Sequence, residues 1–258
     1  MIQTTAPNIH IYAWPERFLY LGPSARTSRH RNHAATWLMA HQGAVRVTLS
    51  TGAVLENEVV YVPAETAFST EDASTLIAAL YWETESESFQ RAAAQFDAMT
   101  PRAFPGAFKN RDALAALYQP NSSRAQADVL LAKIFGLDEL GGSAASSHDQ
   151  RIIEALQFLR EAPDAYDSIE ALAQRVHLSP SRFAHLFKEQ VGVPVRRYVL
   201  WQKMRRALDL AMSGDSLTTA ALTAGFADSA HLSRTVRAIM GVAPEFLFRH
   251  RRQLVLHQ

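Results

Sequence analysis

The sequence has no cysteine, and this absence excludes disulfides, thiol catalysis and thiolate metal sites. Long apolar runs are also missing: no stretch approaches the roughly 18 uninterrupted apolar residues of a membrane-spanning helix, so no membrane partner is expected. The opening residues, MIQTTAPNIH, lack the basic segment and the apolar run of a secretory signal. A cytoplasmic protein is therefore the expectation.

An excess of charge of one sign is missing as well, because the 258 residues carry a formal net charge of only +1. The charge is nevertheless unevenly divided along the chain. Residues 1–148 hold 11 Lys+Arg and 14 Asp+Glu, a balance of −3, whereas residues 168–258 hold 13 Lys+Arg and 6 Asp+Glu, a balance of +7. A basic C-terminal third indicates a polyanionic partner such as nucleic acid.

The hydrophobic pattern changes along the chain and predicts two domains. Between residues 9 and 85, short apolar runs such as Val45-Arg46-Val47-Thr48-Leu49 alternate with turns, which predicts a β-sandwich or small barrel. Helical periods follow up to residue 135, the last of them with an apolar stripe that includes Val129, Leu130 and Ile134. The uncharged stretch 141–147, GGSAASS, predicts a flexible linker, and the pattern after it is helical. The predicted division is a domain of residues 1–140, a linker of 141–148 and an all-α domain of 149–258.

A weak internal repeat lies within the basic third. Its first part recurs at an offset of 48 residues: Asp167-Ser168-Ile169 as Asp215-Ser216-Leu217, Ala173 as Ala221, and Leu178 as Phe226. One extra residue then enters, and the offset becomes 49: Phe183 recurs as Leu232, Phe187 as Val236, and Gly192-Val193 as Gly241-Val242. Each copy predicts a helix, a tight turn and a second helix, with a small alanine where the two helices cross.

The second helix of each copy has one apolar side and one polar side when it is projected at about 100° per residue. Phe183, Leu186 and Phe187 form the apolar side of the first, and Leu232, Val236 and Ile239 that of the second. The opposite sides are short, polar and basic, and we interpret them as free of acidic residues. Such faces suit a DNA major groove, in which Arg, Ser and His reach base edges or phosphates. A long helix over Val195 to Met212, with Arg196 near its start, would set the distance between the two copies.

Residues 168–250 resemble the DNA-binding domain of the AraC/XylS family of transcription regulators. The resemblance rests on SIEALAQRVHLSPSRFAHLFKEQVGVPVRRYV in the first copy and AALTAGFADSAHLSRTVRAIMGVAP in the second. It implies that the second helix of each copy lies in the major groove. Val236 stands where the family usually has Phe, which predicts looser packing in the second copy. The residues expected to contact DNA are Ser181, Arg182, His185, Lys188, Arg196, Ser229, His231, Ser233, Arg234 and Arg237.

The N-terminal region is similar to the cupin-like effector domain of the same family, through SRHRNHAATWLMAHQGAVRVTLSTG and VVYVPAETAFS. The full expectation is thus an α+β protein of two domains, with an N-terminal cupin-like β-barrel and trailing helices before a C-terminal domain of two helix-turn-helix units. Metal-binding cupins use a His-x-His motif, but His30 and His33 are three residues apart and Phe68 replaces the later His. No metal and no cofactor is therefore expected. The candidate effector-pocket residues are Trp14, His30, His33, Trp37 and Tyr61, although each aromatic ring could equally be part of the core.

Three functions compete at this point. The favoured one is a ligand-responsive transcription regulator that is not an enzyme, with double-stranded DNA, an unidentified small-molecule effector, a second copy of the chain and RNA polymerase as partners. The second is a cupin enzyme, which would need a metal bound near His30, His33 and His41. The third is a helical module that binds protein rather than DNA.

Overall fold

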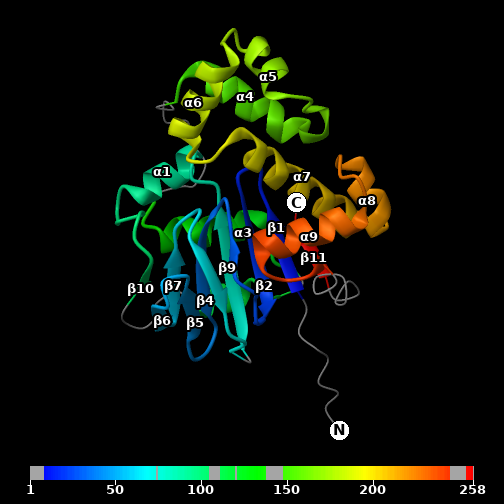
Figure 1. Ribbon diagram of the computed structural model, residues 1–258. Coiled ribbons are helices and arrows are strands. Elements are labelled where there is room, and N and C mark those ends of the chain that lie inside the picture. Colours follow the sequence, from blue (N-terminus) through cyan, green and yellow to red (C-terminus); the bar gives the residue numbers. More distant parts are fainter. Residues whose placement is uncertain are drawn as a thin grey trace. The chain divides into compact units, whose positions relative to one another are not determined.

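The computed structural model describes residues 9–73, 75–104, 111–119, 121–137, 148–244 and 254–257 (Figure 1). The chain divides into two compact units. The β unit consists of Met1–Gly142 together with Met240–Gln258, and the helical unit consists of Ser143–Ile239. Most of the predicted linker, residues 141–147, lies outside the described residues.

Two open sheets form the β unit among the described residues. The larger sheet has the order β10-β7-β4-β9-β2-β1-β11, and the smaller sheet has the order β3-β8-β5-β6. Each order ends in two different strands, so neither sheet closes on itself, and the predicted barrel is not confirmed. The bounds of the strands are β1 Ile9–Ala13, β2 Arg17–Pro23, β3 His30–Arg31, β4 Ala35–Ala40, β5 Val45–Leu49, β6 Val54–Asn57, β7 Val59–Val62, β8 Ala67–Thr70, β9 Leu76–Trp82, β10 Arg102–Phe104 and β11 Leu254–His257.

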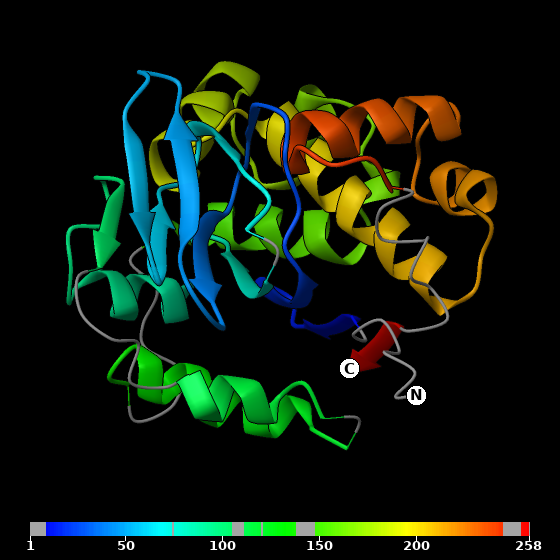
Figure 2. The ribbon, with the colours of Figure 1, turned by 90° about the horizontal axis from the view of Figure 1, so that it is seen from below.

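The helices that trail the strands pack on one face of the larger sheet (Figures 1 and 2). They are α1 Glu87–Ala93, α2 Arg111–Ala116 and α3 Arg124–Ile134. Every second residue of the central strands enters their shared core, as Trp37 and Met39 do from β4, because alternate side chains of a strand point to the same face. The predicted stripe on α3 is partly wrong. Val129 is 71% exposed, and Ala127 and Leu131 are buried instead.

The strand β11 comes from the end of the chain, after the helical unit, and completes the edge of the larger sheet. It runs parallel to β1, with Ile9 opposite Leu254 and Tyr12 opposite His257 (Figure 1). All other strand pairs of the described sheets are antiparallel. A parallel partner needs a long connection, and here that connection contains the whole helical unit.

The helical unit has the helix–turn–helix order that the repeat predicts. Its elements are α4 Gln150–Glu161, the 3₁₀ turn η1 Pro163–Ala165, α5 Ile169–Arg175, α6 Pro180–Val191, α7 Val195–Ser213, α8 Leu217–Thr223 and α9 Ser229–Met240. A core of large side chains, including Phe183, Phe187 and Tyr198, holds α4, α5 and α6 against the start of α7. Around α8, the buried residues are mostly small, such as Ala220, Ala221 and Ala224. Within the described part of the chain, no helix has the length and apolar character to cross a membrane.

Candidate nucleic-acid interface

The first helix-turn-helix unit is formed by α5 and α6. Ser168 caps α5 by accepting a hydrogen bond from the Ala171 amide (3.1 Å), and Ser179 caps α6 by accepting one from the Arg182 amide (3.3 Å). Between the helices, the Leu178 amide donates to the Ala173 carbonyl (2.9 Å), and this bond closes the turn. The predicted turn of this unit is therefore present, and both of its helices are capped by serine.

The second unit, formed by α8 and α9, repeats these bonds at the offsets that the sequence predicts. At the offset of 48, Ser216 accepts from the Thr219 amide (3.0 Å), and the Phe226 amide donates to the Ala221 carbonyl (2.9 Å). At the offset of 49, Asp228 takes the place of Ser179 and accepts from the His231 amide (2.5 Å). The inserted residue thus lies between the turn and the cap of α9. The weak sequence repeat reflects a duplicated structural unit.

One position of the turn differs between the copies. His177 and Gly225 are 48 residues apart and both take a left-handed backbone conformation, with φ of 55° and 80°. Glycine adopts this conformation without a steric penalty, whereas a residue with a Cβ atom is strained there. The sequence places His177 in the predicted turn, but a residue with a Cβ atom does not by itself indicate a positive φ.

The outward side of α6 is polar and accessible. Ser181, Arg182, His185 and Lys188 are all exposed, and Phe183, Leu186 and Phe187 are buried, as the projection predicts. The expectation of a face without acidic residues is wrong by one residue. Glu189 is exposed on α6, and its Oε2 lies 4.0 Å from Nε2 of His185 one turn earlier. His185 therefore shares its surface with a carboxylate that an approaching phosphate would have to displace.

The outward side of α9 carries two arginines and, unlike that of α6, no acidic residue. Arg234 and Arg237 are exposed, whereas Ser229, His231 and Ser233 are only partly exposed. The Ser233 hydroxyl donates to the Ser229 carbonyl (2.8 Å), and the His231 ring packs edge-on against Phe226 with their centroids 5.1 Å apart. These two polar side chains are partly engaged with their own unit. The two arginines are the most accessible groups of this face.

The helix α7 connects the two units and has 19 residues, one more than predicted. At about 1.5 Å per residue it spans about 28 Å. Two reading helices on one side of DNA lie about 34 Å apart, one turn of the duplex, when they enter successive major grooves. Arg196 is exposed in the first turn of α7, so it lies beside the first unit.

The five candidate effector-pocket residues do not form one group in the structure. Trp14, Trp37 and Tyr61 are buried in the core between the larger sheet and its helices. Trp37 is surrounded by aromatic rings, with Tyr61 at 4.5 Å and Phe135 at 5.0 Å between centroids. The two histidines are not part of that core. The packing favours a structural role for Trp37 and Tyr61.

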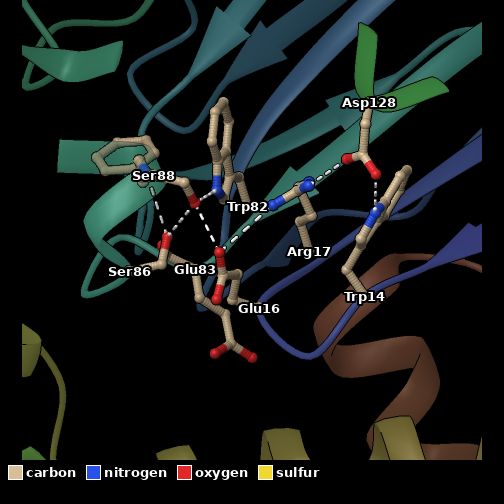
Figure 3. Close-up of polar contacts among 9 residues, drawn as sticks. Trp14, Glu16, Arg17, Trp82, Glu83, Ser86, Ser88 and Asp128 are labelled. Atoms are coloured by element: carbon tan, nitrogen blue, oxygen red, sulfur yellow. Dashed lines mark hydrogen bonds and ion pairs between the residues drawn. The ribbon is translucent and has the colours of Figure 1, made fainter. Parts of the chain in front are cut away.

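Trp14 belongs to a polar network at the edge of this core (Figure 3). Arg17 lies between Trp14 and Trp82, and its guanidinium carbon is 4.5 Å and 5.8 Å from their ring centroids. Its Nη2 donates to Asp128 of α3 (2.5 Å), and its Nη1 donates to Glu16 (3.3 Å). The network joins β2 to a trailing helix. The sequence analysis did not predict this buried arginine and its two carboxylate partners, because Asp128 is far from Arg17 along the chain.

His30 and His33 are both buried but are in different electrostatic surroundings. Burial lowers the pKa of His30, whose Nδ1 is 2.8 Å from the Ser28 carbonyl oxygen. Burial also disfavours the charged form of His33, but the carboxylates of Glu85, 3.5 Å away, Glu83 and Glu65 together outweigh it and raise the pKa of His33. Among the residues that the structure describes, no cluster of three or more His, Asp or Glu side chains could hold a metal ion.

Comparison with known proteins identifies the helical region. Residues 172–250 match a family described as a helix-turn-helix domain. The arabinose operon regulatory protein of Salmonella typhimurium is 33% identical over 98 residues, which cover 37% of this chain and 35% of that protein. Its counterpart in Escherichia coli is 34% identical over 98 residues, which cover 37% of this chain and 34% of that protein.

The helical region is therefore a helix-turn-helix domain that is similar to part of these two regulatory proteins. The predicted resemblance is thus confirmed for the region that carries the repeat. The chain spans about a third of the length of these curated relatives.

The fold of this protein is similar to that of ToxT from Vibrio cholerae. One ToxT structure covers 90% of this chain and 98% of its own at 12% identity, with a TM-score of 0.57. A second, described as bound to an unsaturated fatty acid, covers 90% of this chain and 94% of its own at 12% identity, with a TM-score of 0.50. The shared architecture is an N-terminal β region followed by a helical helix-turn-helix region.

Proposed function

We propose that this protein is a sequence-specific DNA-binding transcription regulator that inserts α6 and α9 into successive major grooves. One observation carries the proposal. Two units with the same caps and turn bonds present exposed basic side chains at the positions that face outward, Lys188 on α6 and Arg234 and Arg237 on α9. The basic balance of residues 168–258 adds the phosphate attraction that any DNA complex needs.

The contacts divide into those that read bases and those that position the duplex. Arg234 lies in the second turn of α9 and is exposed, so we assign it a guanine edge, which arginine binds in a bidentate way. Lys188 and Arg196 lie at the far end of α6 and the start of α7, and we assign them phosphates. The full proposed contact set is Ser181, Arg182, His185, Lys188, Arg196, Ser229, His231, Ser233, Arg234 and Arg237.

The proposed role of the β unit is to bind an effector and to dimerise. In this proposal residues 1–140 form a cupin-like effector domain, residues 141–148 a linker and residues 149–258 the DNA-binding region, whose last strand, β11, pairs with β1 in the β unit. The fold likeness to ToxT, one structure of which is described as fatty acid bound, supports a small-molecule effector. The arabinose operon relatives are named as regulatory proteins, which supports regulation rather than catalysis. A cytoplasmic location is proposed together with this role. A homodimer and RNA polymerase are the proposed protein partners.

Selection of duplexes from a random pool with the full-length chain tests the proposal. The expected outcome is a site with two recognisable half-sites, bound with an affinity that falls steeply as salt rises. Mutation of either half-site should weaken binding. A chain that enriches no sequence, and shifts no duplex in a salt-dependent way, would instead favour a helical module that binds protein.

A catalytic cupin is separated from this function by metal analysis of the purified full-length chain. The regulator proposal expects no stoichiometric transition metal. An equimolar metal that is lost in His30→Ala would support the enzyme instead.

A further inference from the structure

Besides its connection through α7, the second helix-turn-helix unit touches η1, the segment that leads into the first unit. We propose that Asp164, Lys203, Arg206 and Gly225 form a brace that fixes the orientation of the second recognition helix relative to the first. This inference rests on the proposed DNA-binding function, since it concerns how two reading helices are held for one site. All four residues belong to the helical unit.

The first part of the brace is an ion pair between η1 and α7. Nη1 of Arg206 lies 2.5 Å from Oδ1 of Asp164, and the two side chains are 35% and 37% exposed. Asp164 is the central residue of η1, which leads directly into α5 of the first unit. The pair therefore connects the start of the first unit with the middle of α7.

The second part of the brace is the turn of the other unit. Nζ of Lys203 donates to the Gly225 carbonyl (3.3 Å), and Lys203 precedes Arg206 by three residues, so both project from the same side of α7. A methyl group on Gly225 would lie 3.0 Å from Lys203 Nζ and 3.4 Å from the Cα atom of Asp164. The turn between α8 and α9 thus closely approaches the backbone of η1, the segment that leads into the first unit.

The brace restricts rotation of the second unit about α7. A single connecting helix fixes the distance between two units, but each unit is joined to it by a short loop that can bend or twist. A contact away from the helix axis removes that freedom, because rotation of the second unit about α7 would separate Gly225 from Asp164. DNA makes one turn in about 10.5 base pairs, so a half-site moved by one base pair is rotated by about 34°. A braced pair of recognition helices cannot follow such a rotation without cost.

The experiment measures dependence on spacing, which a residue needed only for stability would not change. The full-length chain is titrated with its selected duplex and with duplexes in which one base pair is added or removed between the half-sites. The spacing penalty is the dissociation constant for a duplex of altered spacing divided by that for the selected duplex. An exposed ion pair changes an equilibrium by at most about fivefold, so Asp164→Ala should lower the spacing penalty about threefold. Affinity for the selected duplex itself should change less.

Asp164 is the residue to change because its removal takes no positive charge from the surface that faces DNA. The matched control is Asp167→Ala, which removes the same charge from an exposed residue three positions along the chain. This variant should keep the wild-type spacing penalty. The exchange of Asp164→Arg with Arg206→Asp restores an ion pair of opposite direction and should recover the penalty that Asp164→Ala loses.

The outcomes separate the brace from the proposed function. A wild-type chain that selects no site would overturn both. A wild-type chain that discriminates spacing, with a penalty in Asp164→Ala within about twofold of the wild type, would overturn the brace alone. An equal loss in Asp167→Ala would also overturn it, because the cause would then be general charge rather than this contact.

Discussion

Replacement of Arg17 by methionine tests whether the polar network between β2 and α3 stabilises the β unit. The guanidinium lies over Trp14 at 4.5 Å, and this cation–π contact is worth about 1 kcal/mol in a partly desolvated site. The two carboxylate partners, Glu16 and Asp128, have side chains that are 30% and 36% exposed. Water can therefore rehydrate them, and each ion pair is worth at most about 1 kcal/mol.

Methionine keeps most of the packing of the arginine stem, so little cavity cost is added. The expected loss of unfolding free energy is thus about 2–3 kcal/mol. That loss is less than the roughly 3–5 kcal/mol of a buried pair whose remaining charge has no access to water. Urea unfolding followed by tryptophan fluorescence is a suitable assay, because Trp14, Trp37 and Trp82 lie in the β unit.

The matched control is Arg46→Met on β5. Arg46 also has two carboxylate partners, Glu56 at 3.2 Å and Glu71 at 3.5 Å, but its side chain is 47% exposed. Its replacement should cost less than about 0.5 kcal/mol. Equal losses in the two variants would refute the argument that burial between two tryptophans makes the Arg17 network stabilising. A more stable Arg17→Met chain would refute it as well.

Single features of the two units lead to four other predictions. Arg234→Ala should cost about 1–3 kcal/mol of binding free energy at one base position, and uniform weakening across all sequences in a binding titration would make it a phosphate contact. His177→Gly should raise the unfolding free energy by about 0.5–1 kcal/mol, because it relieves the left-handed backbone, and a lower melting temperature would contradict this. Removal of residues 254–258 leaves the edge of β1 uncovered and should lower the melting temperature of the β unit; unchanged amide exchange in β1 would show that β11 is dispensable. Burial lowers the pKa of His30, so the unfolded chain protonates this histidine before the folded chain does as the pH falls below about 6.5. The stability of the wild type relative to His30→Gln should therefore fall between pH 7 and pH 5.5 in thermal melts.

The helical unit was largely predictable because its determinants are local. A cap such as Ser168 is recognised from the helix-forming residues within three positions of it, and the buried side of α6 is given by helical periodicity. The repeat added independent support, since the same caps and turn occur twice. The prediction was less successful for ion pairs on the helix surface. Glu189 lies next to the polar face of α6, and its pairing with His185 was not anticipated.

The candidate effector pocket stays a prediction, because residue type alone does not distinguish a pocket from a core. Aromatic residues such as Trp37 and Tyr61 occur both in ligand pockets and in hydrophobic cores. Only the residues that surround them distinguish a pocket from a core. In the structure, rings from α1, from the segment after it and from the end of α3 close around Trp37. Which rings meet there depends on how the trailing helices pack, and a hydrophobic pattern does not record that.

Local sequence patterns were sufficient to predict the two helix-turn-helix units, their turns and the outward side chains of α6 and α9. These features depend on residues three or four positions apart, for which backbone geometry leaves few choices. Three features became visible only in the folded chain: the strands form two open sheets, β11 pairs with β1, and Gly225 approaches Asp164. Those contacts join residues far apart in the chain, and they are selected by the free energy of the whole packed arrangement rather than by any local pattern.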